Sequence, residues 1–214
     1  MIEYYVLDTE TTGVARFNEI NQISILRVST GKMITHDIAV KYPERAHPEA
    51  LKIQNKTKAD LKNGIKVEES VPIVNAFFEE DGKKPNARCI VAHNGSFDRR
   101  FCHAAWLGVN SVFPADLWLC TKQYATRWIK KTGSGEKIAL AQNEKKAKLG
   151  LNNLLIGVGI TPKKGAHNSA VDTENCLELF NYLQATKTEY VSLFVNQPHV
   201  LNANQQEDST DEDL

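Results

Sequence analysis

The chain has 214 residues and a formal net charge of zero, with 26 lysines and arginines against 26 aspartates and glutamates. Apolar residues make up 42% and charged residues 24%, which fits a globular domain and excludes a disordered chain, a collagen-like repeat and a disulfide scaffold. No apolar run approaches the roughly 20 residues that span a bilayer, and the first residues do not form a signal peptide. We therefore expect a cytoplasmic protein without a membrane partner.

The zero total hides an uneven distribution of charge. Residues 205–214 hold five acids and no base, and without them 26 bases stand against 21 acids. We expect residues 202–214 to form a disordered acidic tail, which serves either as a solubilising end or as a docking segment for a polymerase or repair partner. An anionic partner for the rest of the chain is therefore not excluded.

The first elements in chain order are strands. Residues 4–9 are rich in β-branched and aromatic side chains, which are typical of a strand. Residues 22–28 and 33–40 form a second and a third apolar segment, and Gly31 supplies the turn between them. We expect these three segments to form an antiparallel meander.

Helices and strands then alternate. A helix is expected over residues 71–80, with Ser70 as its N-cap and a proline in its first turn. Residues 88–92 predict a short apolar strand that leads into a helix from Ser96. An apolar stripe predicts a last helix over residues 169–184. Strands followed by alternating strands and helices indicate an α/β fold with a mixed sheet.

The four cysteines are far apart in the sequence and include no C-x-x-C pair. This spacing does not resemble a structural zinc site. We expect all four to be reduced and buried: Cys89, Cys102, Cys120 and Cys176.

A basic segment follows the middle of the chain. Residues 122–148 hold eight bases against two acids, and Tyr124 and Trp128 lie among them. Basic residues can bind the phosphate backbone of a nucleic acid, and aromatic residues among them can stack on its nucleobases. The alternative is that this segment is a solvated helix and loop. The candidate backbone contacts are Arg127, Lys130, Lys131, Lys145, Lys146 and Lys148.

Carboxylates occur at the predicted ends of several elements. Asp8 and Glu10 are two residues apart at the end of the first strand, so their side chains point to the same face. Asp98 and Asp172 each fall in the first turn of a helix, where the helix dipole also favours an acid. His167 lies in the loop before the last helix. Converging carboxylates repel one another unless a cation neutralises them, and their oxygens suit Mg²⁺ or Mn²⁺.

Together these motifs resemble the DEDDh branch of the DnaQ-like 3′→5′ exonucleases. The family pattern is an Asp-x-Glu on the first strand, an Asn-x-x-x-Asp after a middle strand and a His-x-x-x-x-Asp near the end. This chain carries the pattern in that order, over about residues 4–184. Within the family, residues 93–100 and 118–121 are most similar to exodeoxyribonuclease X.

The resemblance implies a ribonuclease H-like fold, with a mixed five-stranded sheet flanked by helices. The exonuclease domain would then span residues 1–186, followed by a C-terminal extension over 187–201 and the acidic tail. Some relatives are dimers, so a homodimer is one option that no feature of the sequence decides.

The resemblance also implies a two-metal phosphodiesterase that uses two Mg²⁺ ions, for which Mn²⁺ substitutes. Asp8, Glu10, Asp98 and Asp172 would hold the metals. His167 would be the general base, because an ordinary histidine pKa near 6.5 leaves the ring mostly neutral at physiological pH. The residues expected to contact the substrate are Thr11, Thr12, Val14, Ile53, Gln54 and Asn94.

Three functions remain open from the sequence. The first is a DNA 3′→5′ exonuclease that acts on single-stranded or frayed ends in repair or proofreading. The second is an RNA-trimming exonuclease with the same mechanism, because the sequence does not show whether a 2′-hydroxyl is accepted. The third is a non-catalytic module that binds nucleic acid or docks on a polymerase, which a missing acid or histidine would favour.

Overall fold

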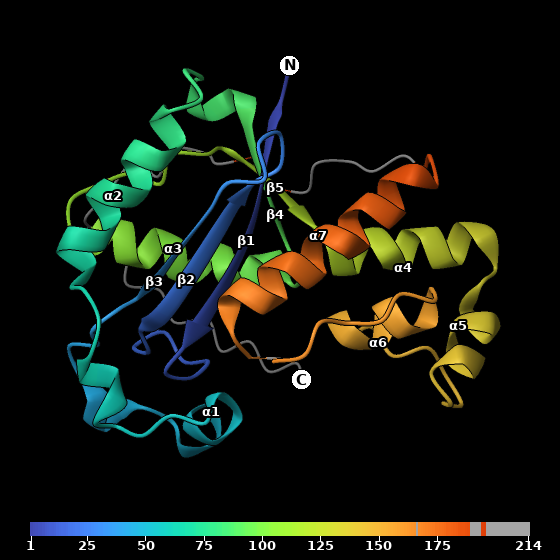
Figure 1. The fold of residues 1–214 in the computed structure, drawn as a ribbon, viewed down its shortest axis with the longest axis horizontal. Coiled ribbons are helices and arrows are strands. Elements are labelled where there is room, and N and C mark those ends of the chain that lie inside the picture. Colours follow the sequence, from blue (N-terminus) through green and yellow to red (C-terminus); the bar gives the residue numbers. More distant parts are fainter. Residues whose placement is uncertain (166, 189–193, 196–214) are drawn as a thin grey trace, which may run out of the picture.

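One mixed sheet runs through the centre of the molecule (Figure 1), and the computed structural model describes residues 1–165, 167–188 and 194–195. The strand order is β3-β2-β1-β4-β5-β6. Strand β2 is antiparallel to both of its neighbours, β1 and β3, whereas β4 and β5 run parallel to β1, and β6 is antiparallel to β5. The strands are β1 (Glu3–Thr11), β2 (Ile20–Arg27), β3 (Met33–Asp37), β4 (Arg88–Ala92), β5 (Leu117–Cys120) and β6 (Phe194–Val195).

The sheet agrees with the sequence prediction and adds one short strand. The antiparallel meander, the parallel strands after it and the ribonuclease H-like arrangement are confirmed. Strand β6 has two residues and extends the predicted five-stranded sheet at its edge. It falls in the predicted C-terminal extension, whereas the acidic tail lies outside the described residues.

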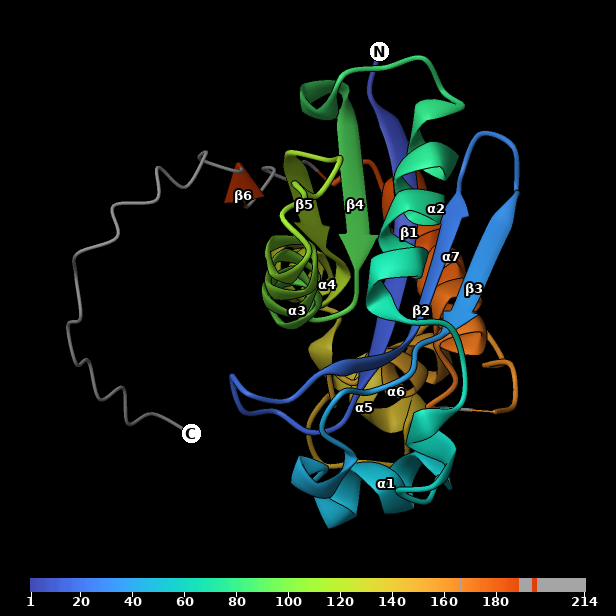
Figure 2. The ribbon, with the colours of Figure 1, turned by 90° about the vertical axis from the view of Figure 1, so that its left-hand side faces the viewer.

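Helices cover both faces of the sheet (Figures 1 and 2). Alternate residues of β1 face opposite ways: Tyr5 and Leu7 pack with α2 and α3, and Val6 packs with α4, α6 and α7. Both cores are fully buried, which explains why the central strands are apolar on both faces. The helices are α1 (Pro48–Gln54), α2 (Val67–Glu79), α3 (Gly95–Gly108), α4 (Thr121–Thr132), α5 (Gly135–Ala141), α6 (Leu151–Gly157) and α7 (Ser169–Ala185), with single 3₁₀ turns at Pro43–Arg45, Asp60–Lys62 and Pro85–Ala87.

Helix α2 begins earlier than the sequence predicts. Its N-cap is Lys66 rather than Ser70, which is buried inside the helix, and Pro72 therefore lies beyond the first turn. The missing N–H of Pro72 leaves only the carbonyl of Glu68 without a helical partner, and both residues are exposed. Solvent can satisfy that carbonyl, so the proline does not fix the start of the helix.

The aromatic residues of the basic segment belong to the core. Tyr124 and Trp128 are 3% and 8% exposed and pack in the cluster beneath α7, and the Tyr124 hydroxyl donates to the carbonyls of Leu183 and Thr188. The expectation that these two side chains stack on nucleobases is therefore wrong. The helical period places Tyr124 and Trp128 on the buried face of α4 and the basic residues on its exposed face. All four cysteines are free and buried, as predicted. Within the described ranges, none of the helices has the length and apolarity to cross a membrane.

Candidate active site

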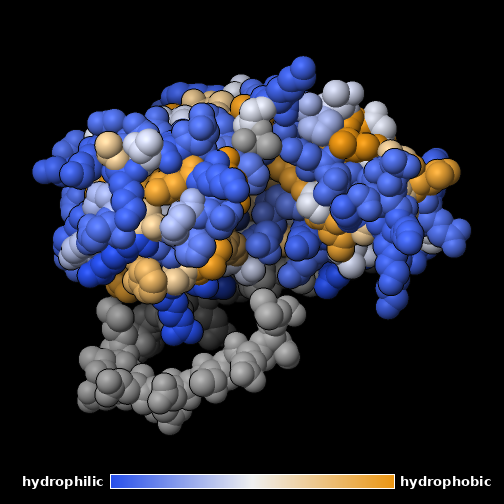
Figure 3. Space-filling model, turned by 90° about the horizontal axis from the view of Figure 1, so that it is seen from below, coloured by the Kyte–Doolittle hydropathy of each residue, from blue (hydrophilic) through white to orange (hydrophobic). Residues whose placement is uncertain are grey.

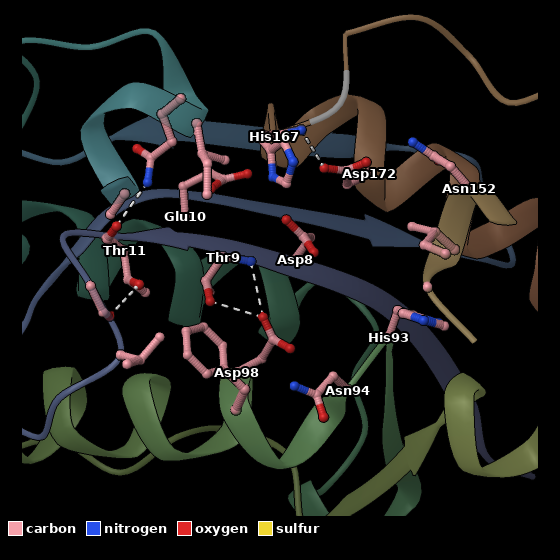
Figure 4. A pocket seen from close by; sticks show the side chains of 18 of the residues that line it. Asp8, Thr9, Glu10, Thr11, His93, Asn94, Asp98, Asn152, His167 and Asp172 are labelled. Atoms are coloured by element: carbon pink, nitrogen blue, oxygen red, sulfur yellow. Dashed lines mark hydrogen bonds between the residues drawn. The ribbon is translucent and has the colours of Figure 1, made fainter. Parts of the chain in front are cut away.

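The predicted catalytic residues meet at one edge of the sheet (Figure 4). Strands β1 and β4 are parallel and end there, and helices α3 and α7 begin there. Carboxyl ends of parallel strands are the usual place for a ligand crevice in an open α/β sheet. Asp8, Glu10, Asp98, His167 and Asp172 line a single cavity at this edge.

Strand alternation distributes the acids between the two helical layers. Asp8 and Glu10 share the face of β1 that is covered by α7, which carries Asp172. Thr9 points the other way, toward α3, and both its backbone N–H (3.1 Å) and its hydroxyl (2.8 Å) donate to Oδ1 of Asp98. Thr9 therefore holds a carboxylate that is 89 residues away in the chain.

The start of α7 is held by hydrogen bonds to β2. The backbone N–H and hydroxyl of Ser169 donate to Oε1 of Gln22 at 2.9 and 3.0 Å. The Asn168 side chain caps the helix by accepting from the backbone N–H groups of Ala170 and Val171. His167 has a positive φ of 64°, and its backbone N–H donates to Oδ2 of Asp172 at 2.8 Å. These contacts bring His167 and Asp172 to the end of β1.

One group of side chains has the spacing of a metal site. Ligand atoms of Glu10, His167 and Asp172 all lie within 4.8 Å of one another. Carboxylate oxygens are the ligands that hard divalent cations prefer, and a neutral imidazole is also a metal ligand. The residues present therefore fit a divalent ion, and His167 is close enough to be either its ligand or a base beside it.

The carboxylates are crowded and poorly solvated. Burial raises the pKa of Asp8 well above its usual range, and the charges of Asp98, Glu10 and Asp172 raise it further. Burial and the charge of Asp172 raise the pKa of Glu10 to about 7, against the attraction of Lys56. Burial raises the pKa of Asp98 to about 7, although the bonds from Thr9 act in the opposite direction. Bound cations would reverse these effects, so the site favours positive charge.

The cavity has a volume of about 600 Å³ and two walls. One wall is formed by Val14 and by residues of α1, and the other by Asn94 and residues 150–153 before and at the start of α6. Seen from below, the surface is hollowed between the lobe that carries α1 and the lobe that carries α5 and α6 (Figure 3). Hydrophilic residues occupy most of this hollow, which suits a charged substrate.

Comparison with known proteins agrees with this geometry. The sequence matches the family model RNase_T, described as Exonuclease, over residues 5–180. The chain belongs to this exonuclease family. It is also 29% identical over 113 residues to the PolC-type DNA polymerase III of Mycoplasmopsis pulmonis, a match that covers 52% of this chain and 7% of the polymerase.

Solved structures share the fold of this exonuclease-family chain. Exonuclease I of E. coli in complex with a dT13 oligonucleotide superposes with a TM-score of 0.69 at 13% identity, covering 86% of this chain and 41% of that one. The nuclease domain of 3′hExo, a DEDDh family member bound to rAMP, gives a TM-score of 0.67 at 11% identity, covering 91% and 96%. This chain thus spans less than half the length of exonuclease I and a small part of the polymerase.

Most residues that were predicted to contact the substrate line the cavity of this exonuclease-family chain. Val14 and Ile53 are apolar yet 75% and 51% exposed. Gln54 closes the α1 wall, because its Nε2 donates to the Thr11 carbonyl at 2.8 Å. Asn94 has a left-handed backbone and is the N-cap residue of α3. The cavity is lined by five of the six, Thr11, Val14, Ile53, Gln54 and Asn94.

Thr12 is the exception, and its predicted contact with the substrate needs correction. Its side chain is 1% exposed, and its hydroxyl accepts from the backbone N–H of Glu19 at 3.0 Å. It is not part of the cavity lining. Thr12 instead bonds Glu19 across the loop that follows β1, and these hydrogen bonds hold the turn that carries Val14.

The six basic candidates are exposed, but none of them lines the cavity. Lys130 and Lys131 lie in the last turn of α4, which starts near the site and runs away from it (Figure 1). Lys148 pairs with Glu144 and directly precedes residues 149–153, of which 150–153 line the cavity. The exposure of these residues leaves a contact with nucleic acid as a prediction.

Sequence reasoning missed several residues that build the site. Thr9 and Gln22 act only through long-range hydrogen bonds, so no local pattern marks them. His93, Phe97 and Leu151 line the cavity as well. His93 was the one with a usable signal, since it is a histidine directly after a buried strand and beside the Asn-x-x-x-Asp motif.

Proposed function

We propose that this chain is a metal-dependent 3′→5′ exonuclease that removes nucleoside 5′-monophosphates from the 3′ end of DNA, preferring single-stranded or frayed ends. The convergence of the four acids and His167 on one cavity carries the proposal. The exonuclease family model spans the same residues. Four carboxylates and a histidine around a cation site suit the hydrolysis of a phosphodiester.

Two Mg²⁺ ions, or Mn²⁺ in their place, suit the oxygen donors. Asp8, Glu10, Asp98 and Asp172 would hold the ions, Asp98 directly or through water. When bound, such ions stabilise the attacking and leaving oxygens of an in-line displacement. His167 would accept a proton from the attacking water on an unprotonated ring nitrogen, and its backbone bond to Asp172 keeps the ring at the site.

DNA is the favoured substrate. Exonuclease I, which shares the fold, is seen with an oligothymidylate, and the matched curated relative is a DNA polymerase. The similarity of residues 93–100 to exodeoxyribonuclease X points the same way. We further propose a repair or proofreading role in the cytoplasm, with the acidic tail as the segment that binds a polymerase or repair partner.

A specific observation favours RNA as the second candidate. The 3′hExo nuclease domain, which covers most of this chain, is bound to rAMP. A ribose needs room for its 2′-hydroxyl beside the catalytic edge. A non-catalytic binding module is not supported by the site, because no member of the acid and histidine set is missing.

The test uses 5′-labelled single-stranded DNA, duplex DNA and RNA, each with Mg²⁺, Mn²⁺ or EDTA. We expect a ladder that shortens from the 3′ end, requires metal and is lost in Asp172→Ala. Faster trimming of DNA than of RNA would assign the substrate, and the reverse would favour the second candidate. Degradation that persists in EDTA or in Asp8→Ala would refute the metal-dependent mechanism.

A further inference from the structure

His93 lines the cavity but is not part of the acid set. Its Nδ1 lies 2.9 Å from the Thr121 hydroxyl, and its Nε2 lies 2.9 Å from the backbone carbonyl of Leu149. A carbonyl can only accept, so Nε2 carries the proton and Nδ1 accepts from Thr121. Both ring nitrogens are therefore occupied, and the ring has a fixed tautomer and orientation.

These two hydrogen bonds join parts of the molecule that are distant in sequence. His93 follows β4 and precedes α3, the helix that carries Asp98. Thr121 is fully buried at the junction of β5 and α4. Leu149 begins the segment 149–153, which we call the α6 wall. His93 thus connects the α6 wall directly to the catalytic edge of the sheet.

Other hydrogen bonds join the α6 wall to Gln142, which follows α5, and to α7. Nε2 of Gln142 donates to the carbonyls of Lys148 and Asn153, at 3.1 and 2.7 Å. Nδ2 of Asn175, on α7, donates to Oδ1 of Asn152 at 3.3 Å. None of these bonds reaches β4 or the start of α3. The hydrogen bond from His93 links the wall to the segment that leads into the helix of Asp98.

We infer that the α6 wall contacts the nucleotides of the substrate and that His93 is the positioning residue that sets its distance from Asp98 and the end of β4. Residues 150–153 line the cavity opposite α1, and Leu151, Asn152 and Asn153 are half-buried there. Leu151 offers an apolar contact for a sugar or base, and the two amides offer donors and acceptors. The inference rests on the proposed function, because it assumes a polynucleotide substrate.

The kinetic signature separates positioning from general structural support. Bis(4-nitrophenyl) phosphate has a phosphodiester but no sugar or base, so it needs the catalytic edge and not the wall. In His93→Ala we expect KM for single-stranded DNA to rise about tenfold, while kcat/KM for the small ester falls less than threefold. Binding of a fluorescent oligonucleotide, measured by anisotropy with Ca²⁺ in place of Mg²⁺, should weaken by the same factor as KM.

Variants of Thr121 provide a milder test that keeps the histidine. Thr121→Val removes the hydroxyl that orients His93 and should raise KM for DNA several-fold, whereas Thr121→Ser keeps the hydroxyl and should not. The effect of Thr121→Val should disappear in the His93→Ala background. His36→Ala is the matched control, because His36 also bonds a hydroxyl, that of Ser70 at 2.8 Å, but lies outside the cavity lining.

Unchanged DNA binding in His93→Ala would overturn the inference, and so would equal losses on DNA and the small ester. The failure of the proposed function looks different. In that case the parent protein would cleave neither substrate, while the anisotropy measurement would still report whether binding of the oligonucleotide depends on His93.

Discussion

The acid cluster should make the metal-free protein less stable than a variant with one charge removed. Asp98 is 3% exposed, and burial raises the pKa of its carboxyl from 3.8 to about 7. A carboxyl with a raised folded-state pKa binds its proton more tightly when folded. It therefore destabilises the folded protein above pH 7, and this cost vanishes as the pH falls toward 4.

Asp98→Asn tests this directly. The asparagine keeps an oxygen that can accept both hydrogen bonds from Thr9, at the 3.1 and 2.8 Å seen for Oδ1. A rise in pKa from 3.8 to about 7 corresponds to at most about 4 kcal/mol at pH 8, at about 1.4 kcal/mol per tenfold change in acidity. The buried amide retains part of the desolvation cost, so we expect a gain of about 1–3 kcal/mol.

The assay is urea and thermal unfolding in EDTA at pH 8 and pH 5. For a chain of this size the gain corresponds to a rise in Tm of about 3–10 °C at pH 8. The difference from the parent should shrink at pH 5. Nuclease activity should be lost in the same variant, since Asp98 is a proposed metal ligand. An Asp98→Asn protein that is no more stable than the parent at pH 8 would refute the reasoning.

Asp81→Asn is the matched control, because it should have the opposite sign. Burial acts to raise the pKa of Asp81, but hydrogen bonds from Arg88, the Lys83 backbone and Tyr5 hold it at about 2. Nη2 of Arg88 lies 2.7 Å from Oδ1 of this buried carboxyl. A depressed pKa contributes stability above about pH 4 that is lost as the pH falls toward 2. Asp81→Asn should therefore lose about 3 kcal/mol at pH 7.

Three further predictions follow from the charge and burial of the described residues. Mg²⁺ should raise Tm more at pH 8 than at pH 5, because Glu10 and Asp98, whose pKa values are raised to about 7, are mostly protonated at pH 5; equal shifts would contradict this. The cysteines are at most 3% exposed, so a thiol reagent should label the native protein far more slowly than the protein in urea; rapid native labelling of all four would contradict the packing. The last prediction concerns four lysines of the basic segment, Lys130, Lys131, Lys145 and Lys146. Replacing all four by glutamine should make the negative slope of log binding constant against log salt concentration shallower by about 3 for single-stranded DNA. An unchanged slope would exclude the basic segment as a DNA contact.

The sequence predicted the parts of the fold that local pattern determines. The first strand, the hairpin around Gly31, the strand at 88–92 and the last helix all occur close to their predicted bounds. The start of α2 was wrong because Pro72 can lie further into a helix when the carbonyl it leaves unpaired is exposed. The two residues of β6 carry too little pattern to predict, since their pairing depends on the edge of β5.

The candidate site divides in a similar way. The acids and His167 were identifiable because their types and spacing follow a family pattern, and the structure brings them together. The burial of Thr12 away from the cavity was not predictable, because it depends on a hydrogen bond from Glu19 across the loop. Tyr124 and Trp128 are four residues apart and share one face of α4, but that this face packs against α7 depends on contacts that are distant in the sequence.

The geometry of the site depends on the register of β1. Asp8 and Glu10 face α7, whereas Thr9 faces α3, and each face holds one of the other two acids. A slip of one residue would turn Asp8 and Glu10 away from Asp172 and remove Thr9 from Asp98 at once. The apolar residues before them, Tyr5 to Leu7, are completely buried in both cores and prevent such a slip. The core therefore fixes the positions of four carboxylates that repel one another. A bound cation would neutralise their charge without moving the strand.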